Sequence, residues 1–107
     1  MILINVSFHV KPEYKDTFLD EVQWYTDACN AEPGCLFFKW YTDPQDDQRF
    51  FLIEGYADGT DVDHVNTEHF KRSCEEMPKY LLETPDIINT KIPGKTEWDK
   101  MAEYKAE

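Results

Sequence analysis

Residues 32–35 (EPGC) and residues 63–70 (DHVNTEHF) flank one apolar hairpin, and together they decide the predicted fold. The Pro-Gly pair cannot continue a helix, so the first stretch ends an amphipathic helix and leads into a strand. The second stretch places His64 and His69 where a further helix is expected to cross a sheet. The combination indicates a compact α+β domain with a pocket between the sheet and its helices.

Outward from these stretches, hydrophobic periodicity predicts the remaining elements. Apolar residues recur at every second position over residues 2–10, as in a strand. An apolar stripe with spacings of three and four predicts one helix from residue 13 to about residue 30. The later predicted elements are strands at 35–43 and 49–56, helices at 61–66 and 68–77, and a strand at 86–92. This β-α-β-β-α-β order is the ferredoxin-like α+β arrangement.

The chain has 107 residues, which suits one hydrophobic core. We expect residues 1–92 to form one domain and residues 93–107 to form a helical tail that packs on the domain or on a partner. The helices that connect these strands cover only one face of the sheet. Asn5 and Ser7 are expected on that face, and the apolar side of the first strand is expected to be buried against a second copy of the chain, as a homodimer. That apolar side comprises Ile2, Ile4, Val6 and Phe8.

The formal net charge is −11, from 22 acidic and 11 basic residues. A surface of this charge repels phosphate backbones and anionic lipids, which argues against nucleic-acid binding and membrane association. No apolar run approaches the ~20 residues of a membrane-spanning helix. The first residues also lack the pattern of a secretory signal. A cytoplasmic location is therefore expected.

The three cysteines, Cys29, Cys35 and Cys74, form no CxxC pair, and an odd number cannot form a closed set of disulfides. Buried, reduced thiols are expected instead, including an unreactive Cys74. The three histidines are not spaced with these cysteines in a zinc-ligand pattern, so no metal site is expected.

Four stretches of the chain carry a family resemblance. They are KPEYKDTF at 11–18, EPGC at 32–35, the strand from Phe50 to Glu54 with Tyr56, and His64-x-x-Thr67-x-His69-Phe70. As a set, they resemble the antibiotic biosynthesis monooxygenase family, small dimeric α+β barrels that include quinol monooxygenases. The resemblance covers roughly residues 2–92 and implies a homodimer with a pocket in each subunit. Oxygenase members of this family oxidise polycyclic or quinol-like aromatics with molecular oxygen and without a metal, flavin or heme.

Two further branches share the same scaffold. Heme-degrading members use an asparagine on the first strand, a tryptophan on the second helix and an axial histidine ten residues later. Asn5 matches the first position, but His64 and Cys74 stand at the other two, which argues against heme degradation. A branch of isomerases has a His-x-x-Thr-x-His pattern close to the one here, and proton transfer by histidine fits either an isomerase or an oxygenase.

The residues and the resemblance together predict a cofactor-independent monooxygenase for a small phenolic or quinol-like aromatic. His64 and His69 are candidate general bases, because an unperturbed imidazole has a pKa of ~6.5. Asn5 is the candidate donor that stabilises the oxygenated intermediate. The predicted substrate-binding residues are Trp40, Phe38, Tyr25, Ser7 and Tyr56.

Structural interpretations and other functions stay open at this point. Core packing is the commoner role for the aromatic residues, and the polar candidates could be satisfied by neighbouring backbone or water. Glu54 is predicted to be structural, hydrogen-bonded to Arg49, Lys39 or the backbone. The alternative functions are an isomerase acting in the same pocket and a non-catalytic dimeric module that binds a small molecule.

Overall fold

The computed structural model describes residues 1–107 and contains four strands, four α-helices and two short 3-10 helices. In chain order these are β1 (Ile2–His9), a 3-10 helix at Pro12–Tyr14, α1 (Phe18–Glu21), α2 (Gln23–Asn30), β2 (Cys35–Asp43), β3 (Asp46–Tyr56), α3 (Asp61–Val65), α4 (Glu68–Glu76), a 3-10 helix at Met77–Tyr80 and β4 (Asp86–Lys91). The helices α1 and α2 form one connection between strands, and α3 and α4 form the other. The predicted ferredoxin-like α+β fold is therefore confirmed.

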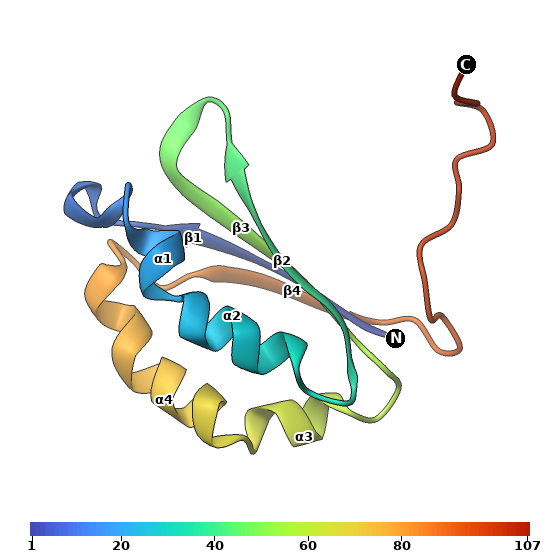
Figure 1. The fold of residues 1–107 in the computed structure, drawn as a ribbon, viewed down its shortest axis with the longest axis horizontal. Helices are drawn as coiled ribbons and strands as arrows, with labels where there is room; N and C mark the ends of the chain where they lie inside the picture. Colours follow the sequence, from blue (N-terminus) through green and yellow to red (C-terminus); the bar gives the residue numbers. More distant parts are fainter.

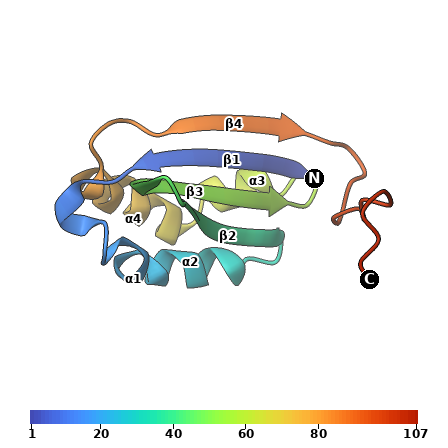
Figure 2. The ribbon, with the colours of Figure 1, turned by 90° about the horizontal axis from the view of Figure 1, so that it is seen from above.

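The four strands form one antiparallel sheet in the order β2-β3-β1-β4. β1 lies inside the sheet and pairs with both β3 and β4, so that Asn5 is opposite Ile53 on one side and Ile88 on the other. The helices all lie on one side of the sheet (Figure 1), and the strands follow one another in this order when seen from above (Figure 2). We call the side beneath the helices the covered face and the other side the open face.

The hydrophobic core lies on the covered face. The sequence predicted that the side of β1 with Asn5 and Ser7 would face the helices, but the opposite side does. The fully apolar side of β1 packs beneath the helices, and each of its side chains is at most 8% exposed. Asn5 is exposed and Ser7 is half-buried on the open face. The prediction was wrong because alternation separates two faces without saying which one is covered. The helices bury an uninterrupted apolar surface, including the fully buried Phe18 and Cys29, and that surface needs an equally apolar partner.

The open face is also partly apolar, although no helix covers it. The strand register places six large apolar or aromatic side chains there, namely Leu3, Phe37, Tyr41, Phe51, Ile53 and Ile88. Of these, Ile88 is 69% exposed and Tyr41 is 49% exposed. The expectation of an uncovered apolar sheet face therefore holds, but for different residues from those expected.

The helix predicted from residue 13 to about residue 30 is broken into segments. A 3-10 helix precedes α1, and the backbone at Val22 leaves the helical region between α1 and α2, with φ −101° and ψ 8°. Most of the predicted apolar stripe is nevertheless buried: Phe18, Val22, Tyr25 and Cys29 are all at most 7% exposed, whereas Leu19, at its edge, is 37% exposed. Tertiary packing thus keeps the stripe on the sheet while the backbone adjusts at the break.

The tail after β4 is not helical, in contrast to the sequence prediction. It runs away from the domain (Figure 1), and its aromatic contact with the domain is the Trp98 ring, 5.4 Å from the Phe37 ring on the open face. Trp98 is 68% exposed and Tyr104 is 80% exposed. A segment this short needs an apolar surface to stabilise a helix, and it buries almost none. No helix in the chain combines the length and the hydropathy needed to cross a membrane.

Candidate functional site

A pocket of about 420 Å³ lies between the covered face and α3 and α4. Its wall is mainly apolar, and its polar side chains are Tyr25, Glu54, His64, Ser73 and Asn89. The size is within the range of sites that bind small organic molecules. A second hollow of about 470 Å³ lies at the surface between Lys15 and Asp47, and it contains no histidine. The pocket beneath the helices is therefore the candidate site.

His64, on α3, is the most highly connected polar residue of the pocket. Its imidazole is buried, with Nδ1 2.8 Å from Glu32 Oε2 and 3.1 Å from the Tyr56 hydroxyl oxygen. On the other side of the ring, Nε2 lies 3.4 Å from the Tyr25 hydroxyl oxygen. The Phe70 ring stacks on the imidazole with a centroid distance of 5.1 Å. Contacts on both edges and one face hold the ring in one orientation.

The junction between α3 and α4 brings His69 to the same carboxylate. The Thr67 hydroxyl donates to the backbone carbonyl of His64 at 2.7 Å and accepts from the backbone N–H of Phe70 at 3.1 Å, so it closes α3 and caps α4. His69 is the second residue of α4, and its Nε2 lies 2.8 Å from Glu32 Oε2. The break between the helices therefore lets two histidines five residues apart face one acceptor.

Glu32 is held in place by the Pro-Gly turn that follows it. The Gly34 carbonyl accepts from the backbone N–H of Ala57 at 2.8 Å and from the Thr60 hydroxyl at 3.3 Å, which fixes the turn against the start of α3. A side chain at Gly34 would place its Cβ 2.3 Å from the Thr60 hydroxyl oxygen, so this approach requires glycine. The Glu32 carboxylate, with its side chain 9% exposed, thus points inward rather than into solvent.

Glu54, on β3, is a second buried carboxyl group in the pocket. Its Oε1 accepts from the Tyr56 hydroxyl at 3.3 Å and lies 3.9 Å from His64 Nε2. Burial raises the pKa of Glu54 to about 7. The predicted partners Arg49 and Lys39 were wrong, because strand alternation directs these two side chains away from the covered face on which Glu54 lies.

The hydrogen-bond pattern assigns the proton of a neutral His64. Glu32 is an acceptor, so Nδ1–H donates to it, and the lone pair of Nε2 is directed toward the Tyr25 hydroxyl. Burial raises the pKa of Tyr25 above its ordinary value, so this hydroxyl stays protonated and can donate. An imidazole oriented by a carboxylate, with its other nitrogen in the acceptor state, is the arrangement of a general base.

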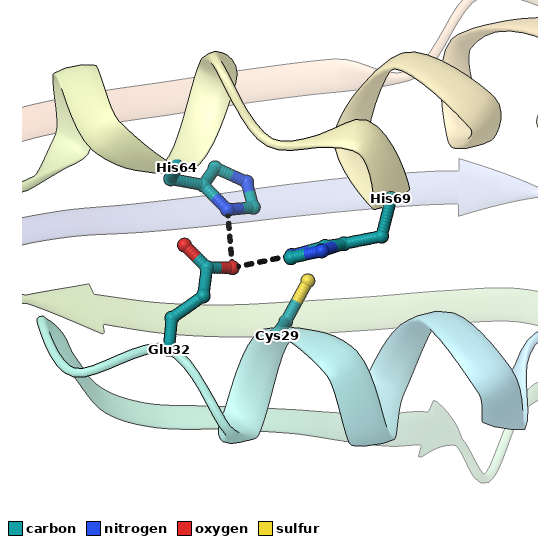
Figure 3. A group of neighbouring side chains, drawn as sticks. All are labelled: Cys29, Glu32, His64 and His69. Atoms are coloured by element: carbon teal, nitrogen blue, oxygen red, sulfur yellow. Dashed lines mark hydrogen bonds and ion pairs between the residues drawn. The ribbon is translucent and has the colours of Figure 1, made fainter.

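Cys29 brings a fourth donor group to this place. One donor atom from each of four side chains, Cys29, Glu32, His64 and His69, lies within 4.8 Å of the others. Figure 3 shows them pointing toward one another from the end of α2 and from the α3–α4 junction. The sequence predicted no metal site, because its cysteines and histidines are not spaced as zinc ligands. These residues are far apart in the sequence and meet only through helix packing. Burial raises the pKa of Cys29, so without an ion it is a thiol.

The other two cysteines are not both buried as expected. Cys35 is half-buried, and burial together with the Glu32 charge raises its pKa to about 11. Cys74 is exposed and lines the rim of the pocket. α4 places it beside the pocket and outside the hydrophobic core, so its thiol is exposed.

Of the predicted substrate-binding residues, only Tyr25 lines the pocket. Tyr56 is fully buried and acts through its hydroxyl contacts with Glu54 and His64. Phe38 and Trp40 belong to the core near α1 and α2, where the Trp40 indole N–H donates to the Thr26 hydroxyl at 2.9 Å. These two aromatic residues pack as core side chains, which is the alternative that the sequence left open.

Asn5 and Ser7 lie on the opposite side of the sheet from the histidines. They line a hollow of about 210 Å³ on the open face, and the Arg49 guanidinium donates to the Ser7 hydroxyl at 3.2 Å. The expectation that both would face the helices was wrong, for the reason given for β1. The structure therefore does not bring Asn5 into the same pocket as His64.

Sequence reasoning missed Glu32 and Cys29 as members of the site. Glu32 precedes a Pro-Gly turn, where an acidic residue is normally solvated, so the sequence carries no signal for its burial. Glu54 did carry a signal, because it stands among apolar residues in a strand. That signal indicated burial but not the side of the sheet.

The fold is a small α+β domain with an antiparallel ferredoxin-like sheet. Beneath its helices lies a mainly apolar pocket, and the wall of this pocket contains a histidine bound to a carboxylate. Such a pocket suits a small molecule. The chain belongs to the antibiotic biosynthesis monooxygenase family, whose model matches residues 1–76. The resemblance seen in the sequence is therefore confirmed.

Individual relatives agree with this assignment. The uncharacterized protein sll1783 of Synechocystis is 28% identical over 92 residues, which are 85% of this chain but only 63% of the relative, slightly less than two thirds of its length. The Bacillus subtilis protein named "Putative monooxygenase YcnE" is 25% identical over 93 residues, 86% of this chain and 98% of the relative. A crystal structure of an antibiotic biosynthesis monooxygenase superposes with a TM-score of 0.75 at 25% identity, covering 86% of this chain and 98% of that one.

Proposed function

We propose that this protein is a monooxygenase that oxidises a small phenolic or quinol-like aromatic with molecular oxygen and needs no cofactor for that reaction. The observation that carries the proposal is the buried His64 imidazole in the wall of a mainly apolar 420 Å³ pocket, with Nδ1 bound to Glu32 and the acceptor nitrogen Nε2 beside the Tyr25 hydroxyl. A flat aromatic substrate fits such a wall, and its hydroxyl group needs a base of this kind.

In the proposed reaction, His64 Nε2 removes the phenolic proton. The electron-rich anion then reduces oxygen and forms a carbon–oxygen bond at the ring. Loss of water breaks the O–O bond, so one oxygen atom enters the product, the other leaves as water, and a phenol becomes a quinone. The Tyr25 hydroxyl, 3.4 Å from His64 Nε2, can donate to the developing oxyanion in this mainly apolar pocket.

His69 and Glu32 act as positioning residues in this proposal. The two histidines share one carboxylate oxygen at 2.8 Å, so His69 helps to hold Glu32 where it orients His64. Asn5, predicted to stabilise the intermediate, receives no such role because it lies on the open face.

A homodimer formed through the open face completes the proposal. The family resemblance implies a dimer, and Phe51, Ile53 and Ile88 give this face an apolar centre that no helix covers. Burial of such side chains is a general driving force for association.

The test is oxygen uptake with a panel of one-ring and two-ring hydroquinones. We expect turnover by the wild-type chain and a loss of about 10²- to 10⁴-fold in His64→Ala, the usual contribution of a general base. His9→Ala is the matched control, because His9 lies at the end of β1 and does not line the pocket. Absence of uptake with every phenol, or equal turnover in wild type and His64→Ala, would contradict the proposal.

One observation favours isomerisation as a second candidate. Glu54 Oε1 and His64 Nε2 lie 3.9 Å apart in the same pocket, so one group could remove a proton from carbon while the other returns one. An isomerase would turn over its substrate equally well without oxygen, whereas the oxygenase would stop. Retention of a small molecule without either reaction would instead indicate a binding module.

A further inference from the structure

Cys29, Glu32, His64 and His69, which we call the donor cluster, form an arrangement that the oxidation of a phenol does not require. They come from three separate places in the chain: the end of α2 and its following turn, α3, and the start of α4. Their donor atoms converge on one point between the helices (Figure 3). A base oriented by a carboxylate uses His64 and Glu32, and His69 helps to hold Glu32, but that reaction gives no role to the Cys29 thiol beside them.

The spacing of the donor atoms is close to that of a four-coordinate ion site. Bonds of about 2.0 Å to nitrogen or oxygen and 2.3 Å to sulfur place the donors of a tetrahedral site with one sulfur about 3.3–3.5 Å apart. Glu32 Oε2 lies 2.8 Å from both imidazole nitrogens, and all four donors lie within 4.8 Å of one another. Side-chain shifts of about 1 Å, which rotamer adjustments provide, convert this geometry into a coordination shell.

We propose that the donor cluster binds one divalent transition-metal ion of the zinc type. Thiolate, imidazole and carboxylate are the ligands that zinc takes in proteins, whereas magnesium and calcium prefer oxygen alone. A thiolate and a carboxylate together carry two negative charges, which balance the charge of the ion in a buried place. The chain's net charge of −11 also favours the approach of cations.

The surroundings of the donor cluster resemble the outer shell of a metal site. His64 would bind the ion through Nδ1, and its opposite nitrogen lies 3.4 Å from the Tyr25 hydroxyl and 3.9 Å from Glu54 Oε1. A carboxylate behind a ligating histidine orients the ring and increases its basicity. Cys29 is fully buried, whereas the His69 side chain is 21% exposed and gives the ion a route from solvent.

Binding of zinc would have a direct consequence for the proposed function. Zinc has no redox chemistry of its own, so it would not activate oxygen. With Nδ1 bound to the ion, the neutral imidazole carries its proton on Nε2 and can no longer accept one. The ion would therefore inhibit phenol oxidation, a consequence that rests on the proposed function, whereas the binding itself does not.

The experiment is a titration of the metal-free, reduced chain with Co²⁺, without any substrate. We expect one Co²⁺ per chain and a near-ultraviolet sulfur-to-cobalt charge-transfer band, both lost when Zn²⁺ is added in equal amount. Native mass spectrometry gives the stoichiometry. No binding at micromolar concentrations, or binding without the sulfur band, would overturn the proposal, since the acidic surface can hold ions without a thiolate.

Variants locate the bound ion. Cys29→Ser should abolish the band and weaken Co²⁺ binding by more than about 100-fold, above the 10- to 100-fold effect of outer-shell changes. Cys35→Ser is the matched control, because it removes a half-buried thiol outside the donor cluster and should leave the band unchanged. A band that survives in Cys29→Ser would refute the assignment.

Circular dichroism of each metal-free variant checks that the fold is retained. If Cys29→Ser does not fold, His69→Ala decides the question, because this side chain is partly exposed and its loss should weaken binding by a similar factor. Unchanged Co²⁺ affinity in His69→Ala would then count against the site. If the chain binds cobalt but oxidises no phenol, the ion site is supported and the proposed oxygenase function is contradicted. If the chain oxidises a phenol but binds no cobalt, the ion site is contradicted and the oxygenase function is supported.

Discussion

The covered and open faces of the sheet come from the same strands but have different environments and contents. On the covered face, every inward side chain of β1 is nearly inaccessible, while on the open face Asn5 is exposed and Ser7 half-buried. The pocket, the donor cluster and Glu54 all lie on the covered side. The open face has an apolar centre and a hollow of about 210 Å³ beside Asn5.

The two faces meet two different requirements: enclosure of buried polar groups on one side, and an apolar surface for association on the other. Buried polar groups need partners, and the covered side supplies them through Tyr25, Tyr56 and the α3–α4 junction. An exposed sheet face offers no such enclosure, but it offers a flat apolar surface to a second copy of the chain. We therefore propose that the covered face carries the chemistry and that the open face carries the assembly.

The largest expected effect comes from neighbouring phenylalanines on β3. Phe50 faces the core and is 3% exposed, whereas Phe51 lies on the open face and is half-buried. Phe50→Ala should lower the free energy of unfolding by about 3–5 kcal/mol, the usual cost of this change in a core. Phe51→Ala should cost less than half of that at low protein concentration. Urea denaturation of both variants measures the difference.

The same pair also distinguishes monomer from dimer. If the open face is an interface, the cost of Phe51→Ala should rise with protein concentration, because the side chain is then buried in the dimer. The cost of Phe50→Ala should stay constant. Equal costs for the two substitutions at every concentration would show that the two faces do not differ as described.

A smaller effect is expected from a charge at the centre of the open face. Ile88 is 69% exposed, and burial of an isoleucine side chain contributes about 1.5–3 kcal/mol. Ile88→Glu should weaken dimerisation at least about tenfold, because that loss and the desolvation of a charge add together. Sedimentation over a series of concentrations gives the dissociation constant.

Val62→Glu is the control for this substitution. Val62 is 59% exposed on α3, away from the sheet, so the same chemical change there should leave the dissociation constant unaltered. A wild-type chain that sediments as a monomer at all concentrations, or a dimer lost in both variants, would contradict assembly through the open face.

The sequence predicted the order of elements well, and most strand ends to within one residue, because these depend on local patterns. The exception is β3, which begins at Asp46 and not at residue 49. Turn residues such as the Pro-Gly pair after Glu32 and the alternation in β1 act over a few residues. Which side of β1 faces the helices depends on packing between distant elements, and the sequence prediction was wrong there. The tail beyond residue 92 failed for a related reason, because its apolar side chains find too little surface to stabilise a helix.

The site was predictable only where a residue contrasts with its neighbours. His64 and His69 stand out by residue type, and the family resemblance placed them near a pocket. Glu32 and Cys29 join them only through the meeting of α2 with the α3–α4 junction, a contact between segments more than 30 residues apart along the chain. The spacing of these residues along the sequence does not indicate such a contact.

The smallest expected effect compares two tyrosines, one beneath the helices and one on the open face. Tyr80 is 5% exposed, and its hydroxyl donates to Glu21 Oε2 at 2.7 Å, whereas Tyr41 on the open face has no hydrogen bond to its hydroxyl. At neutral pH, Tyr80→Phe should lower the free energy of unfolding by about 1 kcal/mol, and Tyr41→Phe should change it by less than about 0.5 kcal/mol.

The pH dependence of the Tyr80 effect tests its cause. Burial, together with the hydrogen bond to Glu21, raises the pKa of Tyr80 to about 12, while an unfolded tyrosine has a pKa of about 10. The folded state therefore favours the protonated hydroxyl, so its stabilising contribution is complete below pH about 10 and is lost as the pH rises toward about 12. The unfolding free energies of wild type and Tyr80→Phe should converge over this interval. The difference in unfolding free energy between wild type and Tyr80→Phe could instead stay constant from neutral to alkaline pH. That result would show that the Tyr80 hydroxyl contributes through packing alone. It would also show that the folded chain does not favour the protonated form of this side chain over the ionised form.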